Sequence, residues 1–248
     1  MFGIKILFVY INKYHVYLFG RLFMKVGIIV ALKKEFDLIT NILDAPLVKR
    51  IKHLTFNEGT FGDNQIVLVQ SGIGKVNAAA ATVEMIDNFA PDKIINTGVA
   101  GGADPILSVM DMVVASEIVY HDVWCGEGEY GQIQGLPTFF QTDEELRQKL
   151  IDTADPEAHL YYGLIASGDK FISDIEEIRN IKSRFSNTLA VDMESAAIAQ
   201  ICYLYKIPFL SMRTISDTPG IQNHYQQYLD FWRDAPLRSF EVVKSLLS

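Results

Sequence analysis

Short runs of β-branched and apolar residues alternate with segments of helical periodicity along most of the chain. We expect strands at residues 26–31, 65–70, 93–98, 111–116, 161–167, 188–192 and 208–216, and helices at 33–43, 75–89, 142–152, 174–183, 193–205 and 222–247. Strands that alternate with helices in this way are typical of an α/β sheet. Several of the strand runs are apolar throughout, as strands covered on both faces are. The pattern therefore predicts an α/β fold.

The predicted elements form one unit. No low-complexity stretch, no linker rich in Pro, Gly or Ser and no fixed-period repeat separates them. A chain of 248 residues with 49% hydrophobic content can bury one full α/β core. We expect residues 24–248 to form a single domain, because Met24 opens the first strand-like segment. Residues 1–23 are apolar but interrupted by charged and polar side chains, so we interpret them as an N-terminal extension outside the fold rather than a membrane span or a secretory signal.

Charge and cysteine content indicate which classes of molecule the chain binds. The formal net charge of -8 gives no general attraction to phosphate backbones, so we expect a small-molecule substrate and neither a nucleic acid nor a membrane as partner. The two cysteines, Cys125 and Cys202, form no Cys-x-x-Cys pair and no cluster with histidine at metal-ligand spacing. We therefore expect no metal and no cofactor, and a reducing compartment, the cytoplasm.

Glycines gather where two of the predicted strands end. Gly72 and Gly74 follow residues 65–70, and further glycines follow residues 93–98. In open α/β sheets, ligands bind at the carboxyl ends of the strands, where the backbone must approach them closely. The loops match neither the Walker pattern nor the dinucleotide-binding pattern, and tight strand-to-helix turns are the alternative explanation. These two loops are nevertheless the first candidates for a binding site.

Eight longer motifs make the pattern specific. In chain order they are MKVGIIVALKKEF (24–36), QSGIGKVNAAAA (70–81), IINTGVAGG (94–102), YHD (120–122), EYGQ (129–132), ASGDKFI (166–172), VDMESAAIA (191–199) and RTISD (213–217). Together they resemble the 5′-methylthioadenosine/S-adenosylhomocysteine nucleosidases of the nucleoside phosphorylase superfamily, from residue 24 to about residue 247. The resemblance implies a three-layer α/β/α domain around a mixed twisted sheet, in a homodimer whose active site lies near the subunit interface.

The resemblance also implies roles for the polar residues of such a site. Glu35 matches the glutamate that orients and deprotonates the attacking water. Asp217 matches the aspartate that donates a proton to adenine N7, with Ser216 holding it in place. Glu194 matches the glutamate that binds the ribose hydroxyls, and Met193 would pack against the sugar.

Further residues would complete the pocket. The resemblance places Phe171 and Ile172 around the adenine base, where the aromatic ring would stack on it. Arg213 would support the water and Glu35, and Ile73 would line the alkylthio side. Tyr228 is expected to cover the 5′ substituent.

These residue types suit the chemistry. Adenine is a poor leaving group as an anion, so cleavage near neutral pH needs a proton at N7, which a positioned carboxylic acid such as Asp217 can supply. The sugar becomes oxocarbenium-like, and a nearby carboxylate such as Glu194 stabilises it electrostatically. Water must arrive at the opposite face of C1′, where a second carboxylate such as Glu35 is required.

Each carboxylate also has a purely structural explanation. Glu35 and Glu194 lie at predicted helix starts, where acidic residues are favoured by the helix dipole. Asp217 in Ser-Asp-Thr-Pro could begin a turn or cap a helix. His121 and His224 are isolated, so we expect them to be surface or supporting residues rather than ligands or bases. The order of the motifs, rather than any one residue, favours the catalytic interpretation.

Three features depart from the family pattern. Val99, in the loop with Ala100 and Gly101, stands where the family commonly has a serine near the ribose and the nucleophile. The segment 123–128 is about two residues shorter than usual, and residues 216–232 enter the last helix differently. Because of Val99 and the short segment 123–128, the sequence leaves open which 5′ substituent the site accepts.

Two other functions therefore stay open. The first is a related purine nucleosidase or phosphorylase, acting on futalosine-type or other purine nucleosides. Phosphorylases of this scaffold clamp phosphate with arginines, and neither VALKKE nor the residues just before INTGVAGG contain one. The second is a nucleoside-binding module without catalysis, for which a water-activating glutamate would be superfluous.

Overall fold

The computed structural model describes residues 24–155, 158–219, 224–234 and 238–247. In these ranges the strands are β1 (Met24–Val30), β2 (Asp44–Ile51), β3 (Leu54–Phe61), β4 (Asn64–Gln70), β5 (Lys93–Gly102), β6 (Met112–Tyr120), β7 (Phe140–Gln141), β8 (Leu160–Ser167), β9 (Thr188–Asp192) and β10 (Phe209–Asp217). The helices are α1 (Lys33–Thr40), α2 (Lys75–Phe89), α3 (Glu144–Thr153), α4 (Ile175–Arg184), α5 (Ser195–Tyr205), α6 (His224–Asp234) and α7 (Arg238–Leu247).

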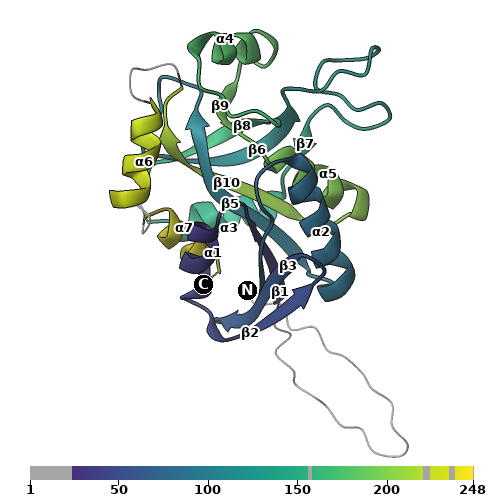
Figure 1. Ribbon diagram of the computed structural model, residues 1–248, viewed down its shortest axis with the longest axis vertical. Helices are drawn as coiled ribbons and strands as arrows, with labels where there is room; N and C mark the ends of the chain where they lie inside the picture. Colours follow the sequence, from purple (N-terminus) through teal and green to yellow (C-terminus); the bar gives the residue numbers. More distant parts are fainter. Residues whose placement is uncertain (1–23, 156–157, 220–223, 235–237, 248) are drawn as a thin grey trace, which may run out of the picture.

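Helices cover both faces of a mixed sheet (Figure 1). α2 and α5 pack together on one face, where their apolar side chains join those of β4 and β5 in one core cluster. α1, α3 and α7 lie on the opposite face and build a second cluster with β1 and β4. Because a sheet and its helices must bury their apolar faces against each other, this arrangement gives three layers. The predicted three-layer α/β/α fold is confirmed.

The strands bring several carboxyl ends to one place. The sheet order is β10-β6-β8-β9-β5-β1-β4-β3-β2, with β7 on β6, and β10 also pairs in parallel with β5. The five strands β5, β9, β8, β6 and β10 therefore close into a ring. Gly101, near the end of β5, is in register with Asp217 of β10 on one side and with Val191 of β9 on the other. A Cβ at this position would lie 3.0 Å from Pro219 and 3.2 Å from Val191, so glycine permits the close meeting of the three chain segments.

The sequence-based elements differ from the structure mainly at the edge of the sheet. β2 and β3 were not expected: nearly all of β2 is exposed and charged residues interrupt it, so it lacks the apolar pattern of a strand. The two-residue strand β7 was also missed. Where one helix was expected at 222–247, the structure has α6 and α7, and residues 222, 223 and 235–237 of that prediction lie outside the described residues. In the described part of the chain, no helix is long and apolar enough to cross a bilayer.

Candidate active site

A pocket lies where β1, β5, β9 and β10 end, and it encloses about 630 Å³ of empty space, part of it open to solvent. Pockets of this size accommodate small organic ligands. Every residue predicted for the site lines it: Glu35, Ile73, Val99, Ala100, Gly101, Phe171, Ile172, Met193, Glu194, Arg213, Ser216, Asp217 and Tyr228. Ala31, Leu32, Lys170, Val191 and Asp192 line it as well and were not predicted. The structure thus brings together residues from distant parts of the chain, while their roles stay predictions.

Glu35 lies in the first turn of α1, directly after β1. Its Oε2 accepts hydrogen bonds from the backbone N–H groups of Ala31 at 3.0 Å and Leu32 at 2.9 Å, and its Oε1 accepts from Val99 at 3.3 Å. The carboxylate therefore caps its own helix, in the first turn where the helix dipole favours acidic residues, and also lines the pocket. Burial raises the pKa of Glu35, although these hydrogen bonds and the charge of Arg213 act in the opposite direction. A raised pKa makes a carboxylate a stronger proton acceptor at neutral pH.

Gly98 separates Glu35 from Arg213. A Cβ at this position would lie 2.6 Å from Nη1 of Arg213 and 2.8 Å from Oε1 of Glu35. Both distances are too short for any side chain, so the residue must be glycine for the guanidinium and the carboxylate to occupy these positions.

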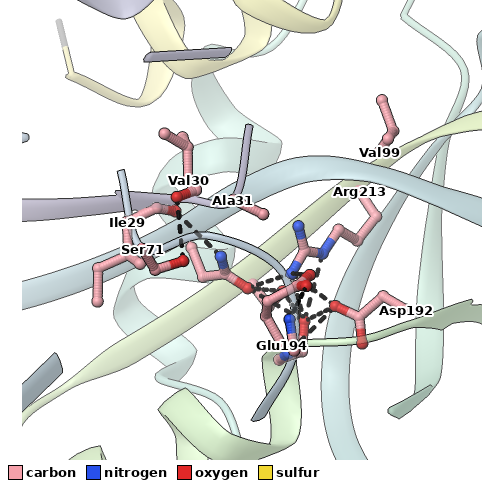
Figure 2. Close-up of polar contacts among 12 residues, drawn as sticks. Ile29, Val30, Ala31, Ser71, Val99, Asp192, Glu194 and Arg213 are labelled. Atoms are coloured by element: carbon pink, nitrogen blue, oxygen red, sulfur yellow. Dashed lines mark hydrogen bonds and ion pairs between the residues drawn. The ribbon is translucent and has the colours of Figure 1, made fainter. Parts of the chain in front are cut away.

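Arg213, in the middle of β10, is 1% exposed and is the centre of a buried polar network (Figure 2). We call Arg213, Asn96, Asp192, Glu194 and Ser195 the Arg213 network. Nη2 of Arg213 donates to Oδ1 of Asn96 at 2.6 Å and to Oγ of Ser195 at 3.1 Å. The same nitrogen forms ion pairs with Asp192 at 2.5 Å and with Glu194 at 3.7 Å. A buried carboxylate is tolerated only when it is paired in this way.

Asp192, Asn96 and Ser195 were not identified as functional from the sequence. Oδ2 of Asp192 accepts from both the backbone N–H and the hydroxyl of Ser195, at 3.1 and 2.5 Å. Asn96 in turn donates from Nδ2 to the carbonyl oxygen of Ile29 in β1 at 3.0 Å. The available signal was a polar residue inside or at the end of an otherwise apolar strand, in the motifs IINTG and VDMES. Such a residue needs a buried partner.

Glu194 immediately precedes α5 and is 5% exposed. Its Oε1 accepts a hydrogen bond from the backbone N–H of Gly74 at 2.9 Å. Burial raises the pKa of Glu194 to about 7; the negative charges of Asp192 and Glu35 act in the same direction, and Arg213 opposes them. The side chain is therefore an oriented acceptor whose charge responds to pH near neutrality.

Asp217 is the last residue of β10 and is 2% exposed. The register of β10 against β5 shifts between Ile215 and Asp217, which turns the strand end toward the pocket. The hydroxyl of Ser216 lies 2.7 Å from Oδ1 of Asp217 and 3.3 Å from the carbonyl oxygen of Ala100, and it can donate to either. Neighbouring groups thus fix the orientation of this carboxyl.

Aromatic rings form one wall of the pocket. Phe171, from the loop between β8 and α4, is 46% exposed, and its ring centroid lies 6.1 Å from that of Tyr228 of α6, at an angle of 75°. Tyr225 stacks on Tyr228 at 6.3 Å. Ile172, the next residue in the lining, is buried. An exposed aromatic face beside buried polar groups suits a flat heteroaromatic ligand.

Acidic groups outnumber basic groups in the pocket lining. Glu35, Asp192, Glu194 and Asp217 contribute four carboxyl groups, whereas Arg213 and Lys170 are the cationic residues of the lining. Arg213 is held by Asp192 and Glu194, and Lys170 pairs with Glu177 outside the lining. The pocket therefore favours developing positive charge over a bound anion.

No histidine lines the pocket among the residues that the structure describes. His121 is buried at the end of β6 and does not line the pocket, and the side chain of His224 lies outside what the structure describes. Among the described residues, no three His, Cys, Asp or Glu side chains are arranged to hold a metal ion.

Comparison with known proteins identifies the family of the chain. The family model described as "Phosphorylase superfamily" matches residues 25–248. The 5′-methylthioadenosine/S-adenosylhomocysteine nucleosidase of Bacillus subtilis (strain 168) is 36% identical over 231 residues, covering 90% of this chain and 98% of the relative. The enzyme of the same name from Exiguobacterium sp. is 39% identical over 227 residues, covering 90% of this chain and 97% of the relative.

Solved structures give the same result. The nucleosidase of this name from S. pneumoniae, with the transition-state inhibitor MT-ImmA, superposes with a TM-score of 0.86 at 35% identity, covering 90% of this chain and 98% of that one. The one from Colwellia psychrerythraea, in complex with adenine, superposes with a TM-score of 0.85 at 36% identity, covering 90% and 94%. The family match and these superpositions thus show a member of the phosphorylase superfamily. Within it, the chain belongs to the 5′-methylthioadenosine/S-adenosylhomocysteine nucleosidase family.

The Arg213 network predicts that removing the guanidinium group strongly lowers the free energy of unfolding. Arg213→Met leaves Asp192 and Glu194 buried without their ion-pair partner, and we expect the free energy of unfolding to fall by about 3–5 kcal/mol. Arg179→Met is the control, since Arg179 pairs with Glu176 on the exposed surface of α4 and should change it by less than about 0.5 kcal/mol. Urea unfolding of both variants measures this, and equal effects would contradict a stabilising role of Arg213.

The raised pKa of Glu194 predicts a pH-dependent stability. Below its ordinary pKa of 4.5 the carboxyl is protonated in both states. As the pH rises toward 7, the unfolded chain releases this proton first, so the folded state loses stability. Between about pH 5 and about pH 8, wild type should lose at least about 1 kcal/mol relative to Glu194→Gln, the equivalent of about one pKa unit. Urea unfolding at both pH values measures the difference, and parallel pH profiles would refute it.

Proposed function

We propose that the chain hydrolyses the N-glycosidic bond of 5′-methylthioadenosine and S-adenosylhomocysteine, releasing adenine and the thioribose product. The observation that carries the proposal is the convergence of Glu35, Glu194 and Asp217, all buried, on one pocket that also has an exposed aromatic face. The names of the relatives, and the adenine and inhibitor in the solved structures, support this substrate class.

We assign Asp217 to the leaving group. Cleavage becomes possible near neutral pH when the base leaves with a proton on N7, and a carboxylic acid held in a fixed direction is suited to deliver it. The Ser216 hydroxyl and the end of β10 supply that fixed direction. Phe171 would stack on the base while Ile172 closes the pocket behind it.

We assign Glu194 to the ribose. Its carboxylate would accept hydrogen bonds from the sugar hydroxyls, and its negative charge would stabilise the oxocarbenium-like sugar as the bond breaks. The Gly74 amide and Arg213 hold it in place. Met193, the neighbouring residue in the lining, would pack on the sugar ring.

We assign Glu35 to the attacking water. Three backbone amides fix its two oxygens, and its raised pKa suits a group that must take a proton. Arg213 and Glu35 both lie next to Gly98. The positive charge of Arg213 would keep the Glu35 carboxylate oriented and would stabilise it after it has released the proton taken from water.

Water is a better candidate for the nucleophile than phosphate. A phosphorylase of this scaffold needs cations that are available to phosphate, whereas Arg213 and Lys170 of the lining are each held by carboxylates. Other purine nucleosides stay open as substrates. Val99 is half-buried in the lining, and its backbone amide still reaches Glu35, so its replacement of a serine changes the pocket wall more than the water site.

We further propose that the active form is a cytoplasmic homodimer with its sites near the interface. Ile73 and Val76 are apolar yet 53% and 79% exposed beside the pocket, and a partner would cover them. Residues 124–128 are exposed and do not line the chain's own pocket, as expected for a loop that reaches a partner. Both cysteines are free, as is usual in a reducing compartment. A monomeric mass in light scattering would contradict the dimer.

The domain organisation also stays a prediction: we expect residues 24–248 to form one domain, with residues 1–23 outside it.

The function is tested by incubating the protein with methylthioadenosine, adenosylhomocysteine, adenosine and inosine, with and without phosphate. We expect phosphate-independent release of adenine from the two thionucleosides. Asp217→Asn should lower kcat by about 10²–10⁴-fold while still binding the nucleoside, because it removes the proton donor and keeps the shape. Asp37→Asn, on the exposed side of α1, is the control and should keep full activity. Strict phosphate dependence, or full turnover in Asp217→Asn, would refute the mechanism.

A further inference from the structure

The loop that begins α2 carries part of the pocket wall. Ile73 lines the pocket, and the backbone N–H of Gly74 donates to Oε1 of Glu194 at 2.9 Å. Helix α2 starts at the next residue, Lys75. The position of this helix start therefore sets the position of a hydrogen bond to Glu194.

Helix α2 has no capping side chain of its own. The residue before it is Gly74, and its first turn contains no acidic residue. The first backbone N–H groups of a helix lack partners within the helix and need an acceptor from elsewhere. Oδ1 of Asp169, from the loop after β8, accepts from the backbone N–H of Lys75 at 2.7 Å, and the helix dipole favours a carboxylate here. A Cβ on Gly74 would lie 2.9 Å from the same Oδ1, so the two segments are in direct contact.

Asp122, just after β6, connects the same two segments a second time. Its Oδ2 accepts from the ammonium group of Lys75 at 2.7 Å and from the backbone N–H of Asp169 at 2.8 Å. The Lys75 ammonium group also lies 5.4 Å from the ring centroid of Tyr120. The side chains of Lys75 and Asp122 are only 23% and 26% exposed, so solvent screens their interaction partly rather than fully.

We propose that Lys75, Asp122 and Asp169 form a clasp that positions the two sides of the active-site pocket relative to each other. On one side, the clasp holds the loop with Ile73 and the Gly74 amide that orients Glu194. On the other side, Asp169 stands two residues before Phe171, the aromatic wall. The three residues do not line the pocket; they are positioning residues that act through Gly74 and the loop after β8. The kinetic part of this inference rests on the proposed function.

The first test compares Lys75→Met with a matched control. Lys182 forms an ion pair with Asp104 at 2.5 Å, with side chains 24% and 28% exposed, so Lys182→Met removes a contact of the same kind and burial away from the pocket. A small misplacement of Glu194 weakens its directional hydrogen bonds to the ribose hydroxyls, which would already be made in the ground state, more than its stabilisation of positive charge in the transition state, which falls off slowly with distance. We expect Lys75→Met to raise KM for methylthioadenosine about tenfold, the equivalent of one charge-assisted hydrogen bond, with a smaller change in kcat. Lys182→Met should leave both constants within about twofold.

Two further variants separate positioning from general damage. Lys75→Arg keeps a cation near Asp122 and should recover most of the wild-type KM. Lys75→Met combined with Asp122→Ala should be no worse than the more damaging single variant, because both changes break the same contact. A KM that stays at the wild-type value in folded Lys75→Met, or a loss that is equal in Lys182→Met, overturns the proposal.

A measurement without substrate keeps the clasp testable independently of the reaction. Amide hydrogen exchange of the peptide covering residues 71–78 should be faster in Lys75→Met than in wild type, and unchanged in Lys182→Met. If wild type releases no adenine, the proposed function is wrong, and the exchange result alone decides: unchanged exchange at 71–78 overturns the clasp.

Discussion

The ion pairs of Arg213 are the interaction on which the site depends. A guanidinium that is 1% exposed, in the middle of β10, contacts Asp192 and Glu194 and lies against Glu35 across Gly98. Carboxylates buried in a protein interior would be too costly without a compensating cation and fixed hydrogen-bond donors. By supplying that charge, Arg213 allows a small pocket to keep several acidic groups close together. The glycines at positions 98 and 101 provide the backbone clearance that the arrangement requires.

This charge arrangement links fold to chemistry. The closing of β10 onto β5 brings the end of β10 with Asp217, the end of β9 with Asp192, and the α5 start with Glu194 to the same place. A pocket with this excess of carboxylates stabilises a sugar that becomes positive and discourages an anionic nucleophile. The choice between water and phosphate thus follows from which cations are available rather than from the fold, which hydrolases and phosphorylases of the superfamily share.

Sequence reasoning succeeded where a signal was local. Helical periodicity predicted α2 at 75–89, and an apolar run predicted β9 at 188–192, both with the observed bounds; the motifs named residues that do meet in one pocket. It failed at β2, an exposed edge strand that pairs with β3 but lacks the apolar pattern that predicts a strand. It also missed Asn96 and Asp192, because a buried network is defined by segments that are far apart in sequence. The contacts of Asp122 and Asp169 with the start of α2 were hidden for the same reason.

The most direct test of the assigned roles is a crystal structure with an uncleavable methylthioadenosine analogue that retains the nitrogen at position 7. We expect a carboxyl oxygen of Asp217 within hydrogen-bonding distance of N7, Glu194 in contact with the ribose hydroxyls, and a water held by Glu35 on the face of C1′ opposite the base. A ligand bound with N7 directed away from Asp217, or with Glu35 on the same face as the base, would contradict these roles.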